Sequence, residues 1–285
     1  MKLTTYINAG LTKVPILDMF SLKKTVSIRF LNRLGAQPFR IWLAEKRYAL
    51  RGKKVGKELK YYIETLEKDG IVVIENFLPQ EQFEALEAEC LLALDKEERT
   101  RIKHDGPNVY TNINFPKLKA YKQIRNVLGS ATVQQLFNAA ERRSFGQEYI
   151  AKHLTTLVQG PEGELTDPET ELHEDTFFNT FKAWLYITDV ELEDAPFVFV
   201  KGSHKNDVTR RKSKSFDYSL KKDKINSRRI SEDELRELGL EETHYVAKKN
   251  TLVMANTLGF HRRLRGKEGH IRIGLAYSTR FNPFI

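Results

Sequence analysis

Hydrophobic positions along the chain follow a helical period in the first half and a strand-like period in the second. Helical spacing is found over residues 61–68, from Gln80 to about Leu94, and from about Ala131 to Glu141. The turn Asp69-Gly70 precedes a short β-branched strand. We therefore predict a mainly β fold with flanking helices, its strands lying at 71–74, 149–160, 176–189, 197–200, 251–256 and 271–278.

Residues 1–57 form a candidate N-terminal arm. Apolar residues such as Phe30, Ile41 and Trp42 are interspersed there with arginines and lysines, and Pro38 is expected to break or to start a helix. One interpretation is a basic helical arm whose apolar side packs on the body of the protein. The other is an arm that contacts an anionic membrane or an anionic protein partner.

A charged segment at 201–245 interrupts the series of strands and is predicted to be an insertion. Its first part, 201–230, holds eleven basic and three acidic residues. Its second part is acidic and helix-like, with Ser231 as a good N-cap and Glu234 three residues later. A long polar segment between core strands is usually a lid, a binding loop or a mobile excursion.

The net charge of +9 is unevenly distributed. Residues 1–60 carry fourteen basic and three acidic side chains, whereas residues 61–285 carry 33 basic and 35 acidic ones. A basic protein normally suggests a nucleic-acid or anionic-membrane partner. Here the body has a net charge of −2 and no evident stacking platform, so nucleic acid is an unlikely partner.

Cys90 is the single cysteine, which excludes an internal disulfide and a CxxC site. A reducing, cytoplasmic setting fits this count. No run of residues approaches the roughly 18 apolar positions that a membrane-spanning helix needs, and the first residues do not form an apolar signal core.

His173-Glu174-Asp175 is the first candidate for chemistry. Residues two apart on a strand share a face, so this imidazole and this carboxylate can converge on one point. They would supply two members of a 2-His-1-carboxylate site, the ligand set of non-haem Fe(II). The alternative is a hydrogen-bonded pair at a strand end.

His261 and Arg272 extend this pattern. His261 lies just past the predicted strand 251–256, and Arg272 lies on the predicted strand 271–278. There it shares a face with Gly274, Ala276 and Ser278, opposite an apolar face, which is typical of a charge aimed into a cavity. A buried guanidinium needs an anionic partner, and its planar fork suits a carboxylate. A barrel carboxylate such as Glu174 or Asp189 could also be that partner.

With these residues in place, the sequence resembles the phytanoyl-CoA dioxygenase family of Fe(II)/2-oxoglutarate-dependent oxygenases. The resemblance covers about 62–285, and it includes the Asp69-Gly70 turn with its strand, Ala183-Trp184, and the segment from Ala195-Pro196 through Gly202-Ser203-His204. It implies a double-stranded β-helix, a cupin-like jelly-roll core, with N-terminal helices packed outside. The dioxygenase domain would then span 58–285.

The resemblance also implies roles for individual residues. His173, Asp175 and His261 correspond to the iron ligands, and Arg272 to the residue that binds the distal carboxylate of 2-oxoglutarate. Trp184 corresponds to a tryptophan close to this co-substrate, although a tryptophan on a barrel strand is often simply core. Thr155 and Thr156 are weaker candidates for the co-substrate pocket. His204 belongs to a turn that is usually structural.

The sequence departs from the family pattern beside the distal histidine. Arg263 occupies the position where a small hydroxyl residue can help to bind the co-substrate. Together with Arg262, Arg265 and the basic part of the insertion, it suggests an anionic substrate, although a solvated loop would show the same residues.

The reaction implied by the resemblance uses Fe(II), 2-oxoglutarate and O2 and hydroxylates a C–H bond of a small-molecule or lipid-like substrate. Asp175 favours hydroxylation over halogenation, which occurs where a small residue leaves that position to chloride. The same ligand set also fits desaturation, epimerisation or cyclisation. A third possibility is a non-catalytic binding module that uses the basic arm.

Overall fold

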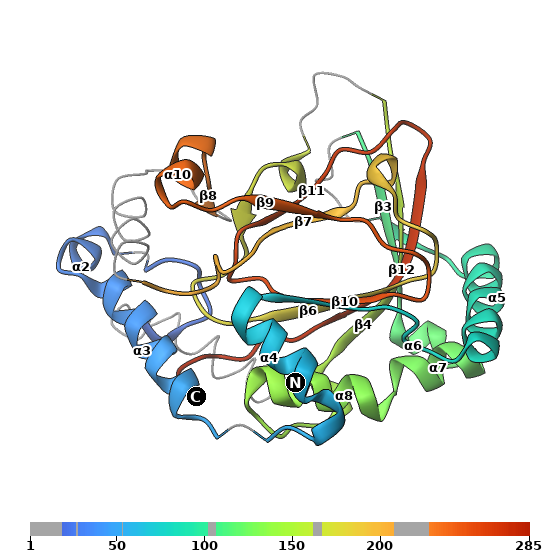
Figure 1. The fold of residues 1–285 in the computed structure, drawn as a ribbon, viewed down its shortest axis with the longest axis horizontal. Helices are drawn as coiled ribbons and strands as arrows, with labels where there is room; N and C mark the ends of the chain where they lie inside the picture. The colour runs from blue at the N-terminus through green and yellow to red at the C-terminus, as the bar shows by residue number, and fades with distance from the viewer. Residues whose placement is uncertain (1–18, 27, 53, 102–106, 162–166, 208–227) are drawn as a thin grey trace.

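The computed structural model describes residues 19–26, 28–52, 54–101, 107–161, 167–207 and 228–285. Two antiparallel sheets face one another (Figure 1). The larger sheet has the order β1-β10-β6-β12-β4-β3-β2 and the smaller one β8-β5-β11-β7-β9. This arrangement is a jelly roll, which confirms the predicted fold class.

The strands of the larger sheet are β1 (Ile71–Ile74), β2 (Thr100–Arg101), β3 (Val109–Asn114), β4 (Ala151–Val158), β6 (Phe181–Tyr186), β10 (Leu252–Asn256) and β12 (Ile271–Ser278). Those of the smaller sheet are β5 (His173–Glu174), β7 (Phe197–Val200), β8 (Arg228–Arg229), β9 (Glu242–Tyr245) and β11 (His261–Arg263).

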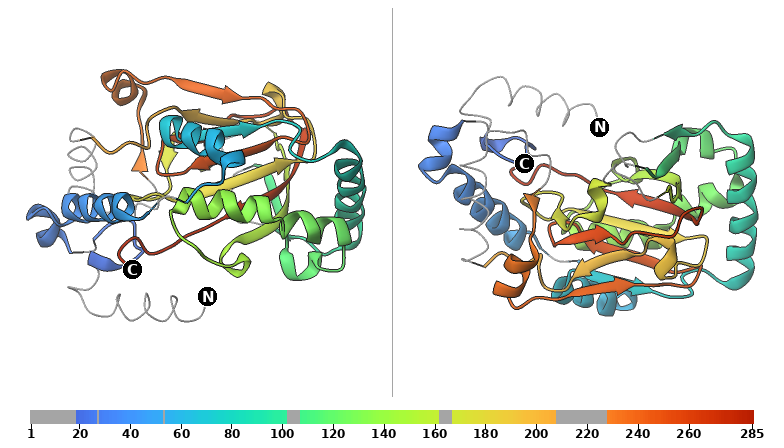
Figure 2. Two further views of the ribbon diagram at one scale, coloured as in Figure 1. Left: turned by 60° about the horizontal axis from the view of Figure 1, so that its bottom comes forward. Right: turned by 90° about the horizontal axis from the view of Figure 1, so that it is seen from above.

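Helices cover the outer face of the larger sheet and its two ends. In Figures 1 and 2, α4 and α8 lie along that outer face, α5 to α7 lie at one end, and α2 and α3 lie at the other. The α-helices are α2 (Arg29–Arg33), α3 (Ala36–Leu50), α4 (Lys60–Asp69), α5 (Gln80–Lys96), α6 (Phe115–Leu118), α7 (Lys122–Leu128), α8 (Ala131–Glu141) and α10 (Glu232–Glu237).

Strand alternation divides the apolar side chains of the larger sheet between two cores. On β6, Ala183 and Leu185 face the helices, whereas Trp184 and Tyr186 face the interior of the barrel. The helix-facing core also takes buried residues from α4, α5, α7 and α8, such as Leu66. Because side chains on one strand point alternately to the two faces, the positions between the helix-facing residues line the interior.

Several predicted elements differ from those observed. The strand predicted at 176–189 is confined to β6, because the hydroxyl of Thr176 donates to the carbonyl of Phe178 and the chain bends before the sheet. Within the segment predicted as an insertion at 201–245, β8 pairs with β5 and β9 pairs with β7. Its helix is present as α10, and the Ser231 hydroxyl accepts the backbone N–H of Glu234 as predicted. Residues 208–227, which hold most of its basic charge, lie outside the described residues.

The N-terminal arm is helical from Arg29 onward, while residues 1–18 lie outside the described part. Pro38 lies in the first turn of α3, so the predicted helix start is confirmed. Ile41 and Ala44 are buried against Phe177 and Phe178 of the body. Arg40 is completely buried. The arm therefore packs on the body of the protein, and it buries Arg40 there as well as apolar side chains.

Candidate functional site

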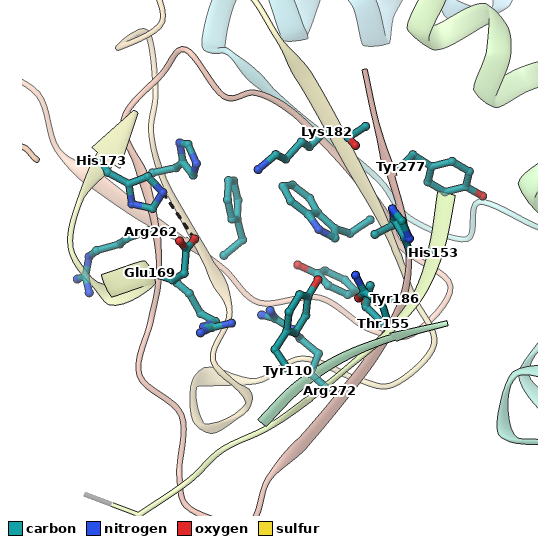
Figure 3. Close-up of a pocket in the computed structure, with 17 residues that line it drawn as sticks. Tyr110, His153, Thr155, Glu169, His173, Lys182, Tyr186, Arg262, Arg272 and Tyr277 are labelled. Carbon is teal, nitrogen blue, oxygen red and sulfur yellow. Dashed lines mark ion pairs between the residues drawn. The ribbon is translucent and has the colours of Figure 1, made fainter. Parts of the chain in front are cut away.

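A cavity of about 330 Å³ lies inside the barrel and is lined by residues of both sheets. Its walls include His173, Lys182, Trp184, His261 and Arg272. Figure 3 shows His173 and Glu169 on one side of this cavity, and Arg272 with Tyr110, Tyr186 and Thr155 on the other. Five of the six predicted site residues therefore line one space, and the sixth, Asp175, lies at its edge through its contact with Lys182.

Three candidate metal ligands converge at one side of the cavity. His173 on β5 and His261 on β11 are direct register partners, and their ring centroids are 4.5 Å apart. Asp175 follows β5 immediately, and its Oδ2 lies 3.8 Å from His261 Nε2. One ligand atom of each residue lies within 4.8 Å of the other two. These separations fit a single ion bound by two imidazoles and one carboxylate.

Backbone carbonyls orient both histidines. Nδ1–H of His173 donates to the carbonyl oxygen of Glu171 at 2.8 Å, and Nδ1–H of His261 donates to that of Gly259 at 2.9 Å. These bonds leave the Nε2 lone pairs facing the site, as in metal centres whose ligands are fixed by outer hydrogen bonds. Burial lowers the pKa of His261 to about 3 and also lowers that of His173. Both rings are therefore neutral near pH 7, the state that binds a metal.

Asp175 is held by the backbone and by one lysine. Its N–H donates to the carbonyl of Thr257 at 3.0 Å, which ties it to the segment preceding His261. Lys182 Nζ lies 2.7 Å from Asp175 Oδ2. Burial alone would raise the pKa of Asp175, but the charge and the hydrogen bond of Lys182 hold it below its ordinary value. Asp175 is therefore an anion that can serve as a metal ligand.

Arg272 supplies a partly buried positive charge on the other side of the cavity. Its guanidinium donates to the carbonyl of Ala195. Among the residues that the structure describes, no carboxylate forms an ion pair with it, and neither Glu174 nor Asp189 is its partner. Burial lowers its pKa, because the charged form loses its hydration. A partly buried guanidinium that faces a cavity without a carboxylate partner fits an anionic ligand such as the distal carboxylate of 2-oxoglutarate.

Trp184 and Thr155 form parts of the wall. Trp184 packs on Phe197 with ring centroids 4.9 Å apart, and Phe197 in turn contacts His261. Thr155 lies opposite Gly274 on the neighbouring strand, and its hydroxyl donates to the Gly274 carbonyl at 3.0 Å. Thr156 is not among the residues that line the cavity, since it points to the opposite face of β4.

The arginines beside His261 are paired within the chain. Arg262 contacts Glu242 through three hydrogen bonds of 2.7 to 3.1 Å. Arg263 lies 2.6 Å from the buried carboxylate of Asp167. Two of the three arginines that suggested an anionic substrate are thus neutralised by carboxylates of the protein itself. Arg263 replaces a hydroxyl at this position without leaving an unbalanced charge.

His204 has the structural role predicted for it. Its Nε2–H donates to the carbonyl of Glu67 at the end of α4, and the neighbouring Ser203 hydroxyl accepts the N–H of Phe260 at 2.7 Å. The Gly202-Ser203-His204 turn therefore connects α4 to the segment that carries His261. His204 is not one of the three converging ligand residues.

The cavity also contains residues that the sequence interpretation missed. Lys182 and Tyr186 flank Trp184 at spacings of two on β6, so strand alternation from Trp184 identifies both. Glu169 Oε2 lies 3.7 Å from His173 Nε2, and Tyr110 comes from β3. The polar loop at 160–170 and the unpredicted strand β3 gave no pattern from which these two could be located.

Comparisons with known proteins agree with this geometry. The family model for phytanoyl-CoA dioxygenase (PhyH) matches residues 66–236. A crystal structure of the epimerase SnoN in complex with Fe3+, α-ketoglutarate and nogalamycin RO has a TM-score of 0.53 at 16% identity, covering 78% of this chain and 82% of that chain. SnoN, described as a non-haem α-ketoglutarate-dependent epimerase from nogalamycin biosynthesis, has a TM-score of 0.50 at 15% identity in another structure, with the same coverage.

A Pseudomonas putida prolyl-4-hydroxylase is also similar, with a TM-score of 0.47 at 17% identity over 78% of this chain and 99% of that chain. No curated protein sequence matches the chain. At these identities the two SnoN structures support the jelly-roll fold alone, whereas the family model covers more than half of the sequence. The chain therefore belongs to the phytanoyl-CoA dioxygenase family, whose cofactor and co-substrates are Fe(II), 2-oxoglutarate and O2.

Proposed function

We propose that His173, Asp175 and His261 bind Fe(II), and that Arg272 binds the distal carboxylate of 2-oxoglutarate in the same cavity. Two features found together in this cavity support the proposal. Three potential ligand atoms lie within 4.8 Å of one another, and the partly buried guanidinium of Arg272, which has no carboxylate partner among the described residues, lines the same cavity. A structural histidine pair would not require the second feature.

The bound iron and its co-substrates supply the oxidising chemistry, in which 2-oxoglutarate is converted to succinate and CO2. The residues of the chain orient the reactants. The carbonyls of Glu171 and Gly259 fix the two imidazoles, and Trp184 with Phe197 forms an apolar wall beside them. Thr155, whose hydroxyl is bonded to Gly274, shapes the wall near Arg272 rather than offering a free hydroxyl.

We propose hydroxylation of a C–H bond in a small-molecule or lipid-like substrate as the outcome. Asp175 supports this outcome because it provides a third protein ligand and leaves no place for a halide. Desaturation, epimerisation and cyclisation need the same ligand set, so the product of the reaction distinguishes them. A substrate that is oxidised by hydroxylation gains 16 Da, whereas an epimerised one keeps its mass.

Turnover of 2-oxoglutarate tests the assignment. Wild-type protein with Fe(II) should produce succinate, whereas His173→Ala and Asp175→Ala should lower this rate at least about hundredfold, because the metal loses a ligand. His244→Ala is the matched control, since His244 is exposed and lies on β9 outside the cavity. Succinate production that continues at the wild-type rate in Asp175→Ala, or after complete chelation of metal, would refute the assignment. A binding module would produce no succinate.

A further inference from the structure

The two N-terminal helices present apolar side chains to solvent. Four exposed large apolar residues lie on α2 and α3, and a fifth, Leu34, follows α2 directly. Their fractional exposures are 67% for Phe30, 69% for Leu34, 46% for Phe39, 42% for Trp42 and 84% for Leu50. We call these five residues the outer face. Phe39, Trp42 and Leu50 lie on one side of α3, because their spacings of three and eight residues bring them to nearby angles on a helix.

The exposure of the outer face does not result from loose packing of α3 on the body. The opposite side of α3 buries Ile41 and Ala44 against Phe177 and Phe178. The buried guanidinium of Arg40 donates to the carbonyls of Met19, Ser21 and Lys23 and to Gln37 Oε1, at 2.6 to 2.9 Å. It also lies over the ring of Phe177 at 4.2 Å. The helix is therefore fixed in one orientation, and its outer face needs another explanation.

The charge around the outer face is strongly positive. Residues 19–57 contain eleven lysines and arginines and one acidic residue, Glu45. Lys46 lies within the outer face itself, between Trp42 and Leu50 along α3, and Arg33 is exposed beside Leu34. Aromatic and aliphatic side chains ringed by cations are typical of helices that lie in the interface of an anionic bilayer. A face of this charge disfavours a second copy of itself, since two such faces repel.

The arm that carries the outer face packs next to the candidate active site. Phe177 and Phe178, on which α3 packs, follow the candidate ligand Asp175 directly in the sequence. The arm is thus placed at the end of the barrel that carries the metal ligands.

From these observations we infer that the outer face of α2 and α3 docks on an anionic lipid bilayer. Phe30, Leu34, Phe39 and Trp42 enter the interface, while Arg33 and Lys46 contact lipid phosphates. An amphiphilic substrate in the bilayer would then lie next to the end of the barrel that holds Asp175. This last consequence rests on the proposed function, whereas the docking itself does not.

Sedimentation of the full chain with vesicles tests the inference. The protein should pellet with vesicles of equal parts phosphatidylcholine and phosphatidylglycerol, and much less with phosphatidylcholine alone. The double variant Phe39→Ser/Trp42→Ser should lower the partition coefficient at least about tenfold, because it removes the apolar anchors. Arg33→Gln/Lys46→Gln should lower it about thirtyfold on the anionic vesicles, since each cation near the surface strengthens binding about fivefold.

Leu91→Ser/Leu92→Ser is the matched control, because both leucines are exposed on α5 at the opposite end of the molecule. This control should bind vesicles as the wild type does, and thermal melting should show that all variants are folded.

Wild-type protein that stays in the supernatant, or Phe39→Ser/Trp42→Ser that binds equally well, would overturn the inference. So would a stable dimer in light scattering that dissociates in this variant, because the outer face would then be covered by a second copy. The outcome does not depend on enzymatic turnover, so it is separable from a failure of the proposed function.

Discussion

At the scale of single residues, the candidate metal site depends on groups that hold each ligand in one orientation. His173 and His261 are fixed by backbone carbonyls, and Asp175 is fixed by Thr257 and faces Lys182. These three candidate ligands were expected from the HxD spacing and from the resemblance, and the structure brings them within 4.8 Å of one another. Lys182 was missed, although it lies two residues before Trp184 on β6 and strand alternation places both on the cavity face.

Lys182 should weaken metal binding at this site. Its ammonium lies 2.7 Å from Asp175 Oδ2, the same oxygen that faces His261 Nε2. A divalent ion therefore competes with it for that oxygen. We expect Lys182→Met to lower the dissociation constant for Mn(II) about tenfold in anaerobic calorimetry. Lys248→Met is the control, because Lys248 is exposed and pairs with Asp189 and Glu191. Unchanged or weaker Mn(II) binding in folded Lys182→Met would show that this ammonium does not compete.

Glu141 should make stability depend on pH. Burial raises its pKa to about 7, against the opposing effects of the Thr279 hydroxyl and Arg143. Between its ordinary pKa of 4.5 and about 7, the folded state holds a proton that the unfolded state has lost. The free energy of unfolding should therefore fall as pH rises through this interval, by about 3 kcal/mol at most.

Urea unfolding at pH 5 and pH 8 tests this prediction. Glu141→Gln, which cannot ionise, should lack the decrease that the wild type shows, so the difference between the two proteins changes with pH. Glu237→Gln, an exposed glutamate on α10, should behave as the wild type does. Parallel pH profiles for wild type and Glu141→Gln would contradict a raised pKa at Glu141.

At the scale of elements, regular strands could be predicted and short ones could not. The alternation on β12 correctly separated Arg272, Ala276 and Ser278 from the apolar positions that face the helices. By contrast, β5 and β11 have only two and three residues, too few to show a period. They exist because His173 and His261 are paired across the sheet, a long-range contact that no local pattern contains.

The turn after α4 connects these elements and should tolerate no side chain. Gly70 has a φ of +85°, and a Cβ there would lie 2.4 Å from His204 Nδ1 and 2.9 Å from the ring of Phe199. We expect Gly70→Ala to lower the free energy of unfolding by at least about 2 kcal/mol, through backbone strain and this overlap. Urea unfolding provides the measurement.

Gly239→Ala separates the two causes. Gly239 also has a positive φ, of +63°, but a Cβ there would meet no atom within 4 Å. In this variant the free energy of unfolding should fall by only about 1 kcal/mol, the cost of placing alanine in a left-handed backbone conformation. If the free energy of unfolding falls equally in the two variants, the overlap of the added Cβ with His204 and Phe199 does not contribute to the loss.

At the scale of the whole molecule, the excess positive charge and the candidate active site lie in different parts of the chain. The +9 net charge suggested a polyanionic partner, but the barrel is close to neutral and the excess lies in the N-terminal arm. The sequence could not show which side of that arm faces solvent, because apolar residues occur on both sides of α3. The tertiary contacts of Arg40, Ile41 and Ala44 decide it. None of the helices in the described residues has the length and apolar character needed to cross a bilayer.

Metal-dependent binding of 2-oxoglutarate tests the central assignment most directly. The account places a metal ion and Arg272 in one cavity of about 330 Å³, so the two ligands should bind cooperatively. In anaerobic calorimetry, 2-oxoglutarate should bind the Mn(II)-loaded wild type at least about tenfold more tightly than the metal-free protein. Asp175→Ala should lose this difference. Equal affinity for 2-oxoglutarate with and without metal would contradict the assignment.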